Sequence, residues 1–409
     1  MSFRTYINET TEKHMTHLED LLWLKGYKGG KETIKYLEVI IHEIDAHNTK
    51  DVTIKIDGAP SIIAGYSPED GRFFVGTKAF FNRTQKINYT NEDIDKNHGH
   101  AKGLADKLKE ALEHFPKVIK KGNIVRGDFL FGQGEVKKET IDNVNGASCT
   151  PNSIKYFFDA KSDAYKKVTQ AKVGIIWHTS YSGSKLDNLN SSFKVSPGAF
   201  SSSKDVYSQT ANITLDTLKW EAQERSTLDS DLKDLKKALN QLNLKGIENL
   251  DKIAGSKVSQ EIMTFINTKV RNNTRMSRGI IRDLFEYIIN KYDGRTIGVA
   301  KKFKTQATID KKTLELKTQK AEIVKALQAM SSELYYLFVW YYKIQEMKDI
   351  IVTKLNSLKT AETPYIIQAD GSFKLSDPEG WVLSDGPSGV KFINRSVFSA
   401  ANFANPKFN

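Results

Sequence analysis

The stretch "DVTIKIDGAPSII", residues 51–63, begins with a strand pattern, because its apolar residues recur at every second position as far as Ile56. A period of two is typical of a strand with one buried face. Lys55 interrupts this apolar run, and Asp57 and Gly58 follow it closely. A lysine in a strand-lined pocket, or beside another cation, has a lowered pKa and can act as a nucleophile. Lys55 is therefore a candidate reactive residue, and a lysine exposed on a solvated strand is the alternative.

Strand patterns continue downstream of this stretch. "SIIAGY" and "FFVG" flank the turn "SPEDG" and predict a hairpin. "NIVRGDFLFG" (123–132) and "KVGIIWHTSYSG" (172–183) predict further strands, and residues 103–115 predict a helix. Before the quoted stretch, apolar residues at helical spacing predict a short helical N-terminal segment, residues 1–50.

A long helical segment separates these strands from a last group. Residues 192–210 are rich in Ser with Pro and Gly, which is typical of a connector. The pattern is then helical, and strand patterns return in "EGWVLSDGPSGVKFINRSVF" (379–398). We predict an α+β domain formed by residues 51–200 plus 366–409, interrupted by a large all-helical insertion at residues 205–365.

The composition limits the class of function. The formal net charge is +12 and the pI is about 9.3, and Lys and Arg gain affinity for polyanions by releasing phosphate counterions. The chain has no run of 18 apolar residues to span a bilayer and no basic-then-apolar signal pattern, so we expect a cytoplasmic protein without membrane contacts. Its single cysteine, Cys149, excludes an internal disulfide. A polyanionic partner is expected, and a basic protein without such a partner is the alternative.

Four further motifs follow Lys55, each on or beside a predicted strand. They contain Asp128 in "IVRGDFLFG", Trp177 and His178 in "GIIWHTSY", Glu379 in "PEGWVL", and Lys391 and Arg395 in "GVKFINR". Together with "KIDG" at Lys55, this ordered series resembles the covalent nucleotidyltransferases, the superfamily of ATP-dependent DNA and RNA ligases and mRNA capping enzymes. The resemblance covers about residues 51–185 and 375–396.

The resemblance implies both a fold and a chemistry. It implies an antiparallel-sheet, ATP-grasp-like adenylation domain of the ligase type. It makes Lys55 the nucleophile that takes AMP from ATP as a lysyl phosphoramidate, with Asp57 orienting the lysine and Gly58 allowing the backbone to approach the nucleotide. Lys391 would hold the α-phosphate. Arg395, on the same strand face by period two, would replace a second lysine of the family.

The resemblance also assigns contacts to the rest of the nucleotide. Lys78 matches a basic residue that contacts the nucleotide or a 5′-phosphate. Asp128 and Glu379 match acidic residues near the ribose and the metal, and two carboxylates suit Mg²⁺ or Mn²⁺. Either Trp177 or His178 would stack on adenine, since strand alternation lets only one of them face the site.

These assignments predict an ATP-dependent polynucleotide ligase that joins a 5′-phosphate to a 3′-hydroxyl on DNA, RNA or mixed nicks. We expect no OB-fold domain, because few residues follow Arg395, and Pro60 stands where DNA ligases usually carry an arginine. Two alternatives stay open. One is an adenylyltransferase that acts on another acceptor, and the other is a noncatalytic nucleic-acid-binding protein.

The helical insertion is the expected contact with nucleic acid. Residues 201–365 contain 28 Lys and Arg against 20 Asp and Glu. Four arginines recur at helical spacing, which would place them on one helical face, where phosphate groups would relieve their repulsion. They are Arg271, Arg275, Arg278 and Arg282. We expect a monomer that binds nicked duplexes or polynucleotide ends. The resemblance to the ligases suggests a role in nucleic-acid repair in a virus-infected cell. A solvated basic face is the alternative.

Overall fold

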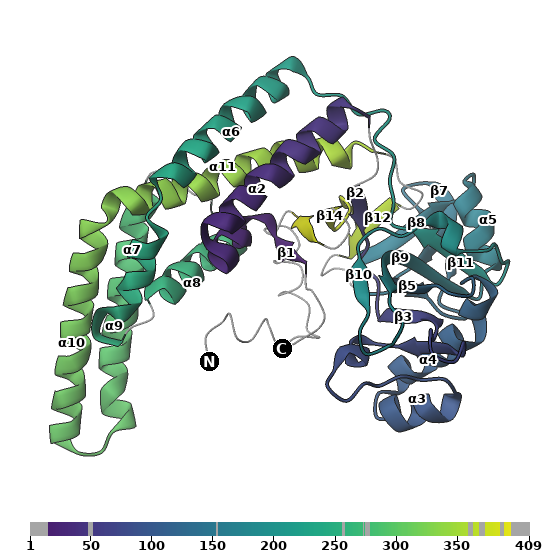
Figure 1. Ribbon diagram of the computed structural model, residues 1–409, viewed down its shortest axis with the longest axis horizontal. Helices are drawn as coiled ribbons and strands as arrows, with labels where there is room; N and C mark the ends of the chain where they lie inside the picture. The colour runs from purple at the N-terminus through teal and green to yellow at the C-terminus, as the bar shows by residue number, and fades with distance from the viewer. Residues whose placement is uncertain are drawn as a thin grey trace.

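The computed structural model describes residues 15–47, 52–152, 154–255, 258–272, 274, 279–358, 363–367, 373–384 and 388–393. Within this part, strands and helices combine in an α+β fold whose strands pair mainly in antiparallel fashion. This confirms the α+β class that the sequence predicts. Strands lie on one side of the molecule and long helices on the other (Figure 1).

A first sheet contains the strand that ends at Lys55. Its order is β1-β15-β14-β2, in which β14 pairs antiparallel with both of its neighbours and β1 runs parallel to β15. Gly380 lies opposite Lys55 in the register of β14 and β2. The sheet therefore brings the beginning and the end of the described chain together. Its strands are β1 (Thr16–His17), β2 (Val52–Lys55), β14 (Gly380–Ser384) and β15 (Gly389–Phe392).

A second sheet has the order β10-β9-β5-β3-β4. One face packs against α3 and α4, and the 3₁₀ helices η2, η3 and η4 lie in the loops around it. The strands are β3 (Ser61–Tyr66), β4 (Phe73–Gly76), β5 (Ile124–Phe131), β9 (Val173–Ser182) and β10 (Asn190–Ser192). The helices are η2 (Lys78–Phe81), α3 (Asn91–His98), α4 (Lys102–His114), η3 (Phe115–Lys117) and η4 (Pro197–Ala199).

A strand that the sequence patterns did not predict completes the second sheet. β11 (Val206–Thr210) pairs parallel with β9 along its length. The prediction that the helical insertion begins at residue 205, after a connector at 192–210, is wrong at this point. Val206 and Tyr207 are buried in this sheet, so backbone pairing with β9 prevails over the Ser-rich composition of the segment.

A third sheet, with the order β13-β12-β8-β7-β6, is antiparallel throughout. Asp142 and Asn143 both have positive φ at the tight turn between β6 and β7, which matches the hand of turn that hairpins favour. β12 begins at Thr363, so this strand also starts inside the range predicted as helical. The elements are β6 (Lys137–Ile141), β7 (Val144–Cys149), β8 (Ile154–Asp159), α5 (Asp163–Gln170), β12 (Thr363–Ile367) and β13 (Phe373–Leu375).

Helices occupy the chain between β11 and β12, as well as the N-terminal part that was predicted to be helical. The N-terminal helix α2 is broken at Gly26, whose positive φ favours glycine. The long helices α2, α6 and α11 lie side by side, and α9 and α10 form a hairpin that extends away from them (Figure 1). The helices are η1 (Leu18–Asp20), α2 (Leu21–Asp45), α6 (Ala222–Gln241), α7 (Leu244–Asn249), η5 (Leu250–Gly255), α8 (Val258–Arg271), α9 (Ile280–Lys302), α10 (Gln306–Ala329) and α11 (Ser331–Asn356).

The helices and the first sheet share one hydrophobic core. Leu37 of α2, Leu235 of α6 and Ile344 of α11 belong to the same buried cluster as Trp381 of β14 and Phe392 of β15. The Trp381 indole also donates a hydrogen bond of 2.8 Å to the Asn356 side chain at the end of α11. The strand that carries Lys55 is therefore fixed in a sheet that packs against the helices.

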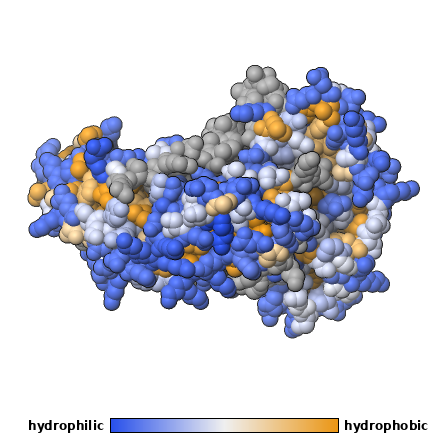
Figure 2. All heavy atoms as spheres, turned by 90° about the horizontal axis from the view of Figure 1, so that it is seen from above, coloured by the Kyte–Doolittle hydropathy of each residue, from blue (hydrophilic) through white to orange (hydrophobic). Residues whose placement is uncertain are grey.

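The face of the molecule seen from above is largely hydrophilic. In the view from above, hydrophilic residues cover most of the face, and hydrophobic residues form only small groups (Figure 2). No helix among the described residues has the length and apolarity needed to cross a membrane.

Two glycines inside α9 offer a test of helix stability. Gly294 and Gly298 are four residues apart, and a Cβ added at either position would meet no atom within 4 Å. Glycine in a helix interior costs about 1 kcal/mol relative to alanine. We expect Gly294→Ala combined with Gly298→Ala to raise the free energy of unfolding by about 1–2 kcal/mol in urea titrations. A lower stability in the double variant would contradict this assignment of α9.

Candidate active site

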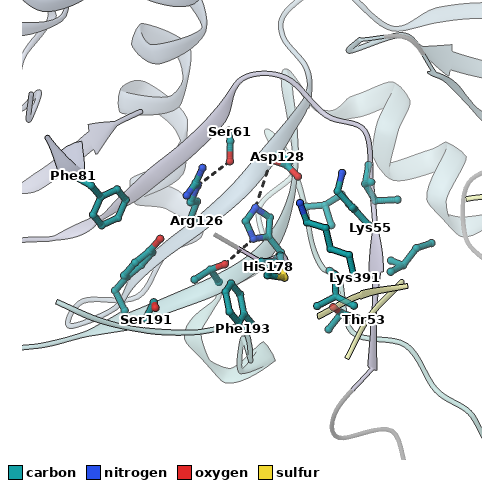
Figure 3. Close-up of a pocket in the computed structure, with 18 of the residues that line it drawn as sticks. Thr53, Lys55, Ser61, Phe81, Arg126, Asp128, His178, Ser191, Phe193 and Lys391 are labelled. Carbon is teal, nitrogen blue, oxygen red and sulfur yellow. Dashed lines mark hydrogen bonds and ion pairs between the residues drawn. The ribbon is translucent and has the colours of Figure 1, made fainter. Parts of the chain in front are cut away.

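A cavity of about 240 Å³ lies between the first and second sheets. Lys55 and Lys391 line it from the first sheet, and Arg126, Asp128 and His178 line it from the second (Figure 3). The chain passes from β2 of the first sheet to β3 of the second directly after Lys55. This crossover, and the pairing of β14 with both β2 and β15, bring together residues from four of the five predicted motifs.

Lys55 forms an ion pair with Glu379, the acidic residue just before β14. The contact follows from the sheet register, because Gly380 lies opposite Lys55 and places Glu379 beside it. Burial raises the pKa of Glu379; the Lys55 charge opposes that rise, and Asp57 and Asp128 add to it. The carboxylate of Glu379 therefore binds a proton more readily than an ordinary glutamate does.

Lys391 supplies a second ammonium group to the same cavity. It lies in β15 opposite Val382 of β14, and both residues line the cavity. Burial lowers the pKa of Lys391, and the positive charge of Lys55 lowers it further. Two lysines that repel each other across one cavity are well placed to bind an anion with several charges, because the anion relieves their repulsion.

The lowered pKa of Lys391 predicts a dependence of stability on pH. Folded Lys391 loses its proton below the ordinary value of 10.5, so between these two pKa values the unfolded chain binds more protons, and stability rises with pH. We expect Lys391→Met to remove this contribution, leaving a smaller rise in the free energy of unfolding than in the wild type as the pH increases toward 10.5. Urea titrations across this range measure the difference, with Lys137→Met on the exposed strand β6 as the control. Parallel pH profiles for the wild type and Lys391→Met would refute the assignment.

A β-bulge points His178 into the cavity. Arg126 of β5 pairs with Thr179 of β9, but the next residue, Gly127, pairs with Trp177, so His178 is an extra residue in β9. His178 and Thr179 both line the cavity, although strict alternation would place neighbouring side chains on opposite faces. The His178 Nδ1 atom lies 2.7 Å from the Thr179 hydroxyl, which fixes the ring.

Asp128 faces His178 across this part of the cavity. The His178 Nε2 and Asp128 Oδ1 atoms are 3.5 Å apart. Burial raises the pKa of Asp128, but His178 and then Lys55 lower it by more, so the pKa lies below the usual value of a free aspartate. Asp128 therefore stays ionised and gives the cavity a fixed negative charge beside its two lysines.

Trp177 is not part of the cavity, so its prediction as a nucleotide-binding residue is wrong. Its side chain is fully buried on the opposite face of the second sheet. There it stacks on Phe200 with ring centroids 5.5 Å apart, and it meets Phe115 edge-on at 5.2 Å. The indole N–H donates to the Ser208 hydroxyl at 2.8 Å. Of the two candidates, His178 is the one that faces the site.

Asp57 and Gly58 have structural surroundings that the sequence did not reveal. The Asp57 backbone N–H donates to the Tyr156 hydroxyl at 2.6 Å, and its carboxylate accepts from the Asn152 amide at 2.9 Å. A Cβ at Gly58 would lie 2.7 Å from the Asp128 Cβ. Gly58 therefore allows a close approach to β5, where the sequence suggested an approach to a nucleotide. Asp57 lies beside the cavity and is not among the residues that line it.

Lys78 lies away from the cavity, exposed at the start of η2. The arginine that does line the cavity is Arg126, whose Nε donates to the Ser61 hydroxyl at 3.0 Å. Its place could have been inferred from the sequence, because it precedes Asp128 by two residues in a strand and so shares a face with it. Lys78 is therefore not the basic residue of the cavity, its contact with a nucleotide or a 5′-phosphate stays a prediction, and Arg126 is the residue that was missed.

Aromatic residues form the other end of the cavity and were also missed. Phe81 of η2 and Tyr181 of β9 lie with ring centroids 5.5 Å apart, and Phe193 also lines the cavity. Figure 3 shows Phe81 at the far side of Arg126 from the two lysines. The cavity thus has an aromatic end and a charged end, separated by the guanidinium of Arg126.

Several predicted residues lie outside the described part of the structure. These are Arg395, Arg275 and Arg278, together with the side chain of Arg271. Arg282 is described, and its side chain is exposed, with its Nε 3.9 Å from Glu286. The four-arginine face therefore stays a prediction.

The carboxylates of the site fit a metal ion that arrives with phosphate groups. Among the described residues, no group of three or more His, Cys, Asp or Glu side chains could hold an ion by itself. Asp128 and Glu379 nevertheless approach the same charged end of the cavity from different sheets. Mg²⁺ commonly binds through one or two carboxylates plus substrate phosphates and water, so this pair fits such an ion.

The whole described fold falls within one protein family. The model of a family of unknown function, DUF6267, matches residues 11–407. The chain belongs to this family. No curated protein and no solved structure matches the chain.

Proposed function

We propose that this protein is an ATP-dependent polynucleotide ligase that works through a lysyl-AMP intermediate on Lys55. One observation carries the proposal, namely that Lys55 shares a cavity with Lys391, Asp128 and His178 while paired to Glu379. A nucleophilic lysine, a second cation and two carboxylates are the groups that nucleotidyl transfer needs.

Glu379 supports the first step as the general base that accepts a proton from Lys55. Lys55 must lose a proton before its amine can attack, and the raised pKa of Glu379 suits it to accept that proton. The Lys55 nitrogen then bonds to the α-phosphorus of ATP and releases its second proton to solvent, which leaves the phosphoramidate N–H. The bond from that phosphorus to the bridging oxygen breaks, and pyrophosphate leaves.

The rest of the cavity matches the parts of an adenine nucleotide. Lys391 would neutralise the α-phosphate, and the aromatic end at Phe81 and Tyr181 would hold the base, with Arg126 between them. A Mg²⁺ or Mn²⁺ ion bound through Asp128 and Glu379 would supply further charge stabilisation at the phosphates.

Two further transfers complete the proposed reaction. An oxygen of a 5′-phosphate attacks the AMP phosphorus, the phosphorus–nitrogen bond breaks, and Lys55 regains a proton. A 3′-hydroxyl then attacks the activated 5′-phosphorus, AMP leaves, and the two ends are joined. Holding both ends in line is the main source of rate in such reactions, because there is little other covalent chemistry for the protein to do.

Incubation with α-labelled ATP and Mg²⁺ tests the proposal. We expect the protein to become covalently labelled and to transfer the label to nicked duplexes carrying a 5′-phosphate, with a joined product. Duplexes with DNA or RNA on each side of the nick identify the substrate. Label without joining on any of them would favour an adenylyltransferase that uses another acceptor. Absence of label would favour a noncatalytic nucleic-acid-binding protein.

A further inference from the structure

The α9–α10 hairpin is a long arm whose two halves differ. α9 has 23 residues and α10 has 24, so each spans about 35 Å at 1.5 Å per residue. Near its base the arm is anchored by buried residues, among them Leu284, Ile288, Ile323 and Leu327. It leaves the layer of α2, α6 and α11 on the same side as β3 and β4 (Figure 1).

Charges near the middle of the arm are paired. Lys291 and Arg295 both bind the Glu261 carboxylate of α8, and Lys320 binds Asp293 across the hairpin. Opposite charges therefore balance each other here, and these lysines and arginines serve the contacts between helices.

Charges at the tip are unbalanced. Residues 297–317 contain six lysines against two carboxylates, Asp310 and Glu315. Lys312 pairs with Glu315 at 2.6 Å, but the other five lysines make no ion pair with any described residue. All five lie on the exposed surface, and they are Lys301, Lys302, Lys304, Lys311 and Lys317.

The tip also exposes apolar side chains. Ile297 is 71% exposed, Leu314 is 67% exposed and Phe303 is 38% exposed. Phe303 and Leu314 lie between the exposed lysines in the sequence, and Ile297 lies four residues, about one helical turn, before Lys301. Solitary exposed apolar residues are common on protein surfaces, but together with five unpaired lysines they form a surface suited to a polyanion that also presents apolar groups.

We infer that the tip of the α9–α10 hairpin, residues 297–317, is a second nucleic-acid contact that binds the sugar–phosphate backbone away from the break. The inference rests on the proposed function, since it assumes that the substrate is a polynucleotide. Phosphates would neutralise the unpaired lysines, and sugars would cover Ile297, Phe303 and Leu314.

The geometry of the arm favours a duplex of more than one helical turn. One turn of B-form DNA measures about 34–36 Å, similar to the length of the arm. An arm of this length can reach a stretch of backbone that a short duplex centred on the cavity would not supply. The contact should therefore add affinity for long substrates without any effect on the chemistry at Lys55.

Binding of long and short nicked duplexes tests this surface. In the triple variant Lys301→Ala, Lys302→Ala, Lys304→Ala, we expect affinity for a nicked duplex of about 36 base pairs to fall about tenfold to a hundredfold at low salt, and the slope of log affinity against log salt to decrease by up to about 2.7. Affinity for a duplex of about 12 base pairs should hardly change. A matched control removes three exposed lysines of the strand region, Lys137, Lys138 and Lys161.

The outcomes separate this inference from the proposed function. If the triple variant binds the long duplex as tightly as the wild type does, the inference is wrong, whatever the labelling of Lys55 shows. Equal losses in the triple variant and the control would also overturn it, because the loss would then reflect net charge alone. Lysine-dependent binding to vesicles containing phosphatidylserine, with no dependence for DNA or RNA, would assign the tip to an anionic membrane instead. A selective loss on the long duplex supports the inference even if wild-type protein takes no label from ATP.

Discussion

Lys55→Ala is expected to take no label from α-labelled ATP, whereas the wild-type protein becomes labelled within the same incubation. The alanine has no amine to bond to phosphorus, and the other lysine of the cavity, Lys391, enters from β15 on the far side of β14. Denaturing electrophoresis of the labelled protein measures this directly. The loss should be complete, because no second nucleophile replaces the one that forms the covalent intermediate.

Controls for this variant come from the structure. Lys55→Arg keeps a positive charge beside Glu379 but lacks a usable amine lone pair, so it should fold and still take no label. Lys78→Ala removes an exposed lysine outside the cavity and should label as the wild type does. Label retained in Lys55→Ala would mean that Lys55 is not the nucleophile. Loss in Lys78→Ala would support the prediction that Lys78 contacts the nucleotide.

Glu19→Ala is expected to lower the free energy of unfolding by about 3–5 kcal/mol, since it would leave a buried lysine without its counter-charge. Glu19 of η1 and Lys348 of α11 form an ion pair at 2.9 Å, with side chains 7% and 8% exposed. The pair joins the N-terminal part of the chain to the longest helix of the described structure, close to the first sheet. Urea unfolding of purified protein measures the loss.

Replacing both partners distinguishes a lost charge pair from a general packing defect. The double variant Glu19→Leu, Lys348→Met should recover most of the stability, because two apolar groups of similar size need no counter-charge. Glu32→Ala provides a comparison, since its partner Lys25 has a side chain that is 45% exposed, and its loss should cost less than about 1 kcal/mol. A double variant as unstable as Glu19→Ala would show that packing around η1, and not the charge pair, controls stability.

Local sequence patterns were sufficient to predict the strands that carry much of the charged end of the site. The period of two around Lys55 predicts its strand, and the strand patterns near Glu379 and Lys391 follow from the same rule. Asp128 and His178 were also predicted on strands, and both face the cavity. These predictions succeed because strand period and chain order are local properties.

Other features of the site depend on irregularities that local patterns do not encode. The choice between Trp177 and His178 depends on a single extra residue in β9, and the bulge appears only in the pairing with β5. Which basic residue lines the cavity, Arg126 and not Lys78, depends on the direction in which the loop with η2 leaves the sheet. β11 was missed because its Ser-rich composition is typical of a loop, and its pairing with β9 outweighs that composition.

The sequence alone predicts that the stretch "DVTIKIDGAPSII" begins with a strand and that a lysine, an aspartate and a glycine stand at its end. The passage of the chain from this strand into a second sheet appears only in the structure. Three contacts appear only in the tertiary structure. Gly58 allows the close approach of its segment to β5, and Asp57 is hydrogen-bonded to Tyr156 and Asn152. Lys55 forms an ion pair with Glu379. These contacts cannot be predicted from local patterns because they join residues that are far apart in the sequence. The contact between Lys55 and Glu379 joins residues 324 positions apart, and it forms because β14 pairs with β2 while the helices between them pack on the same sheet.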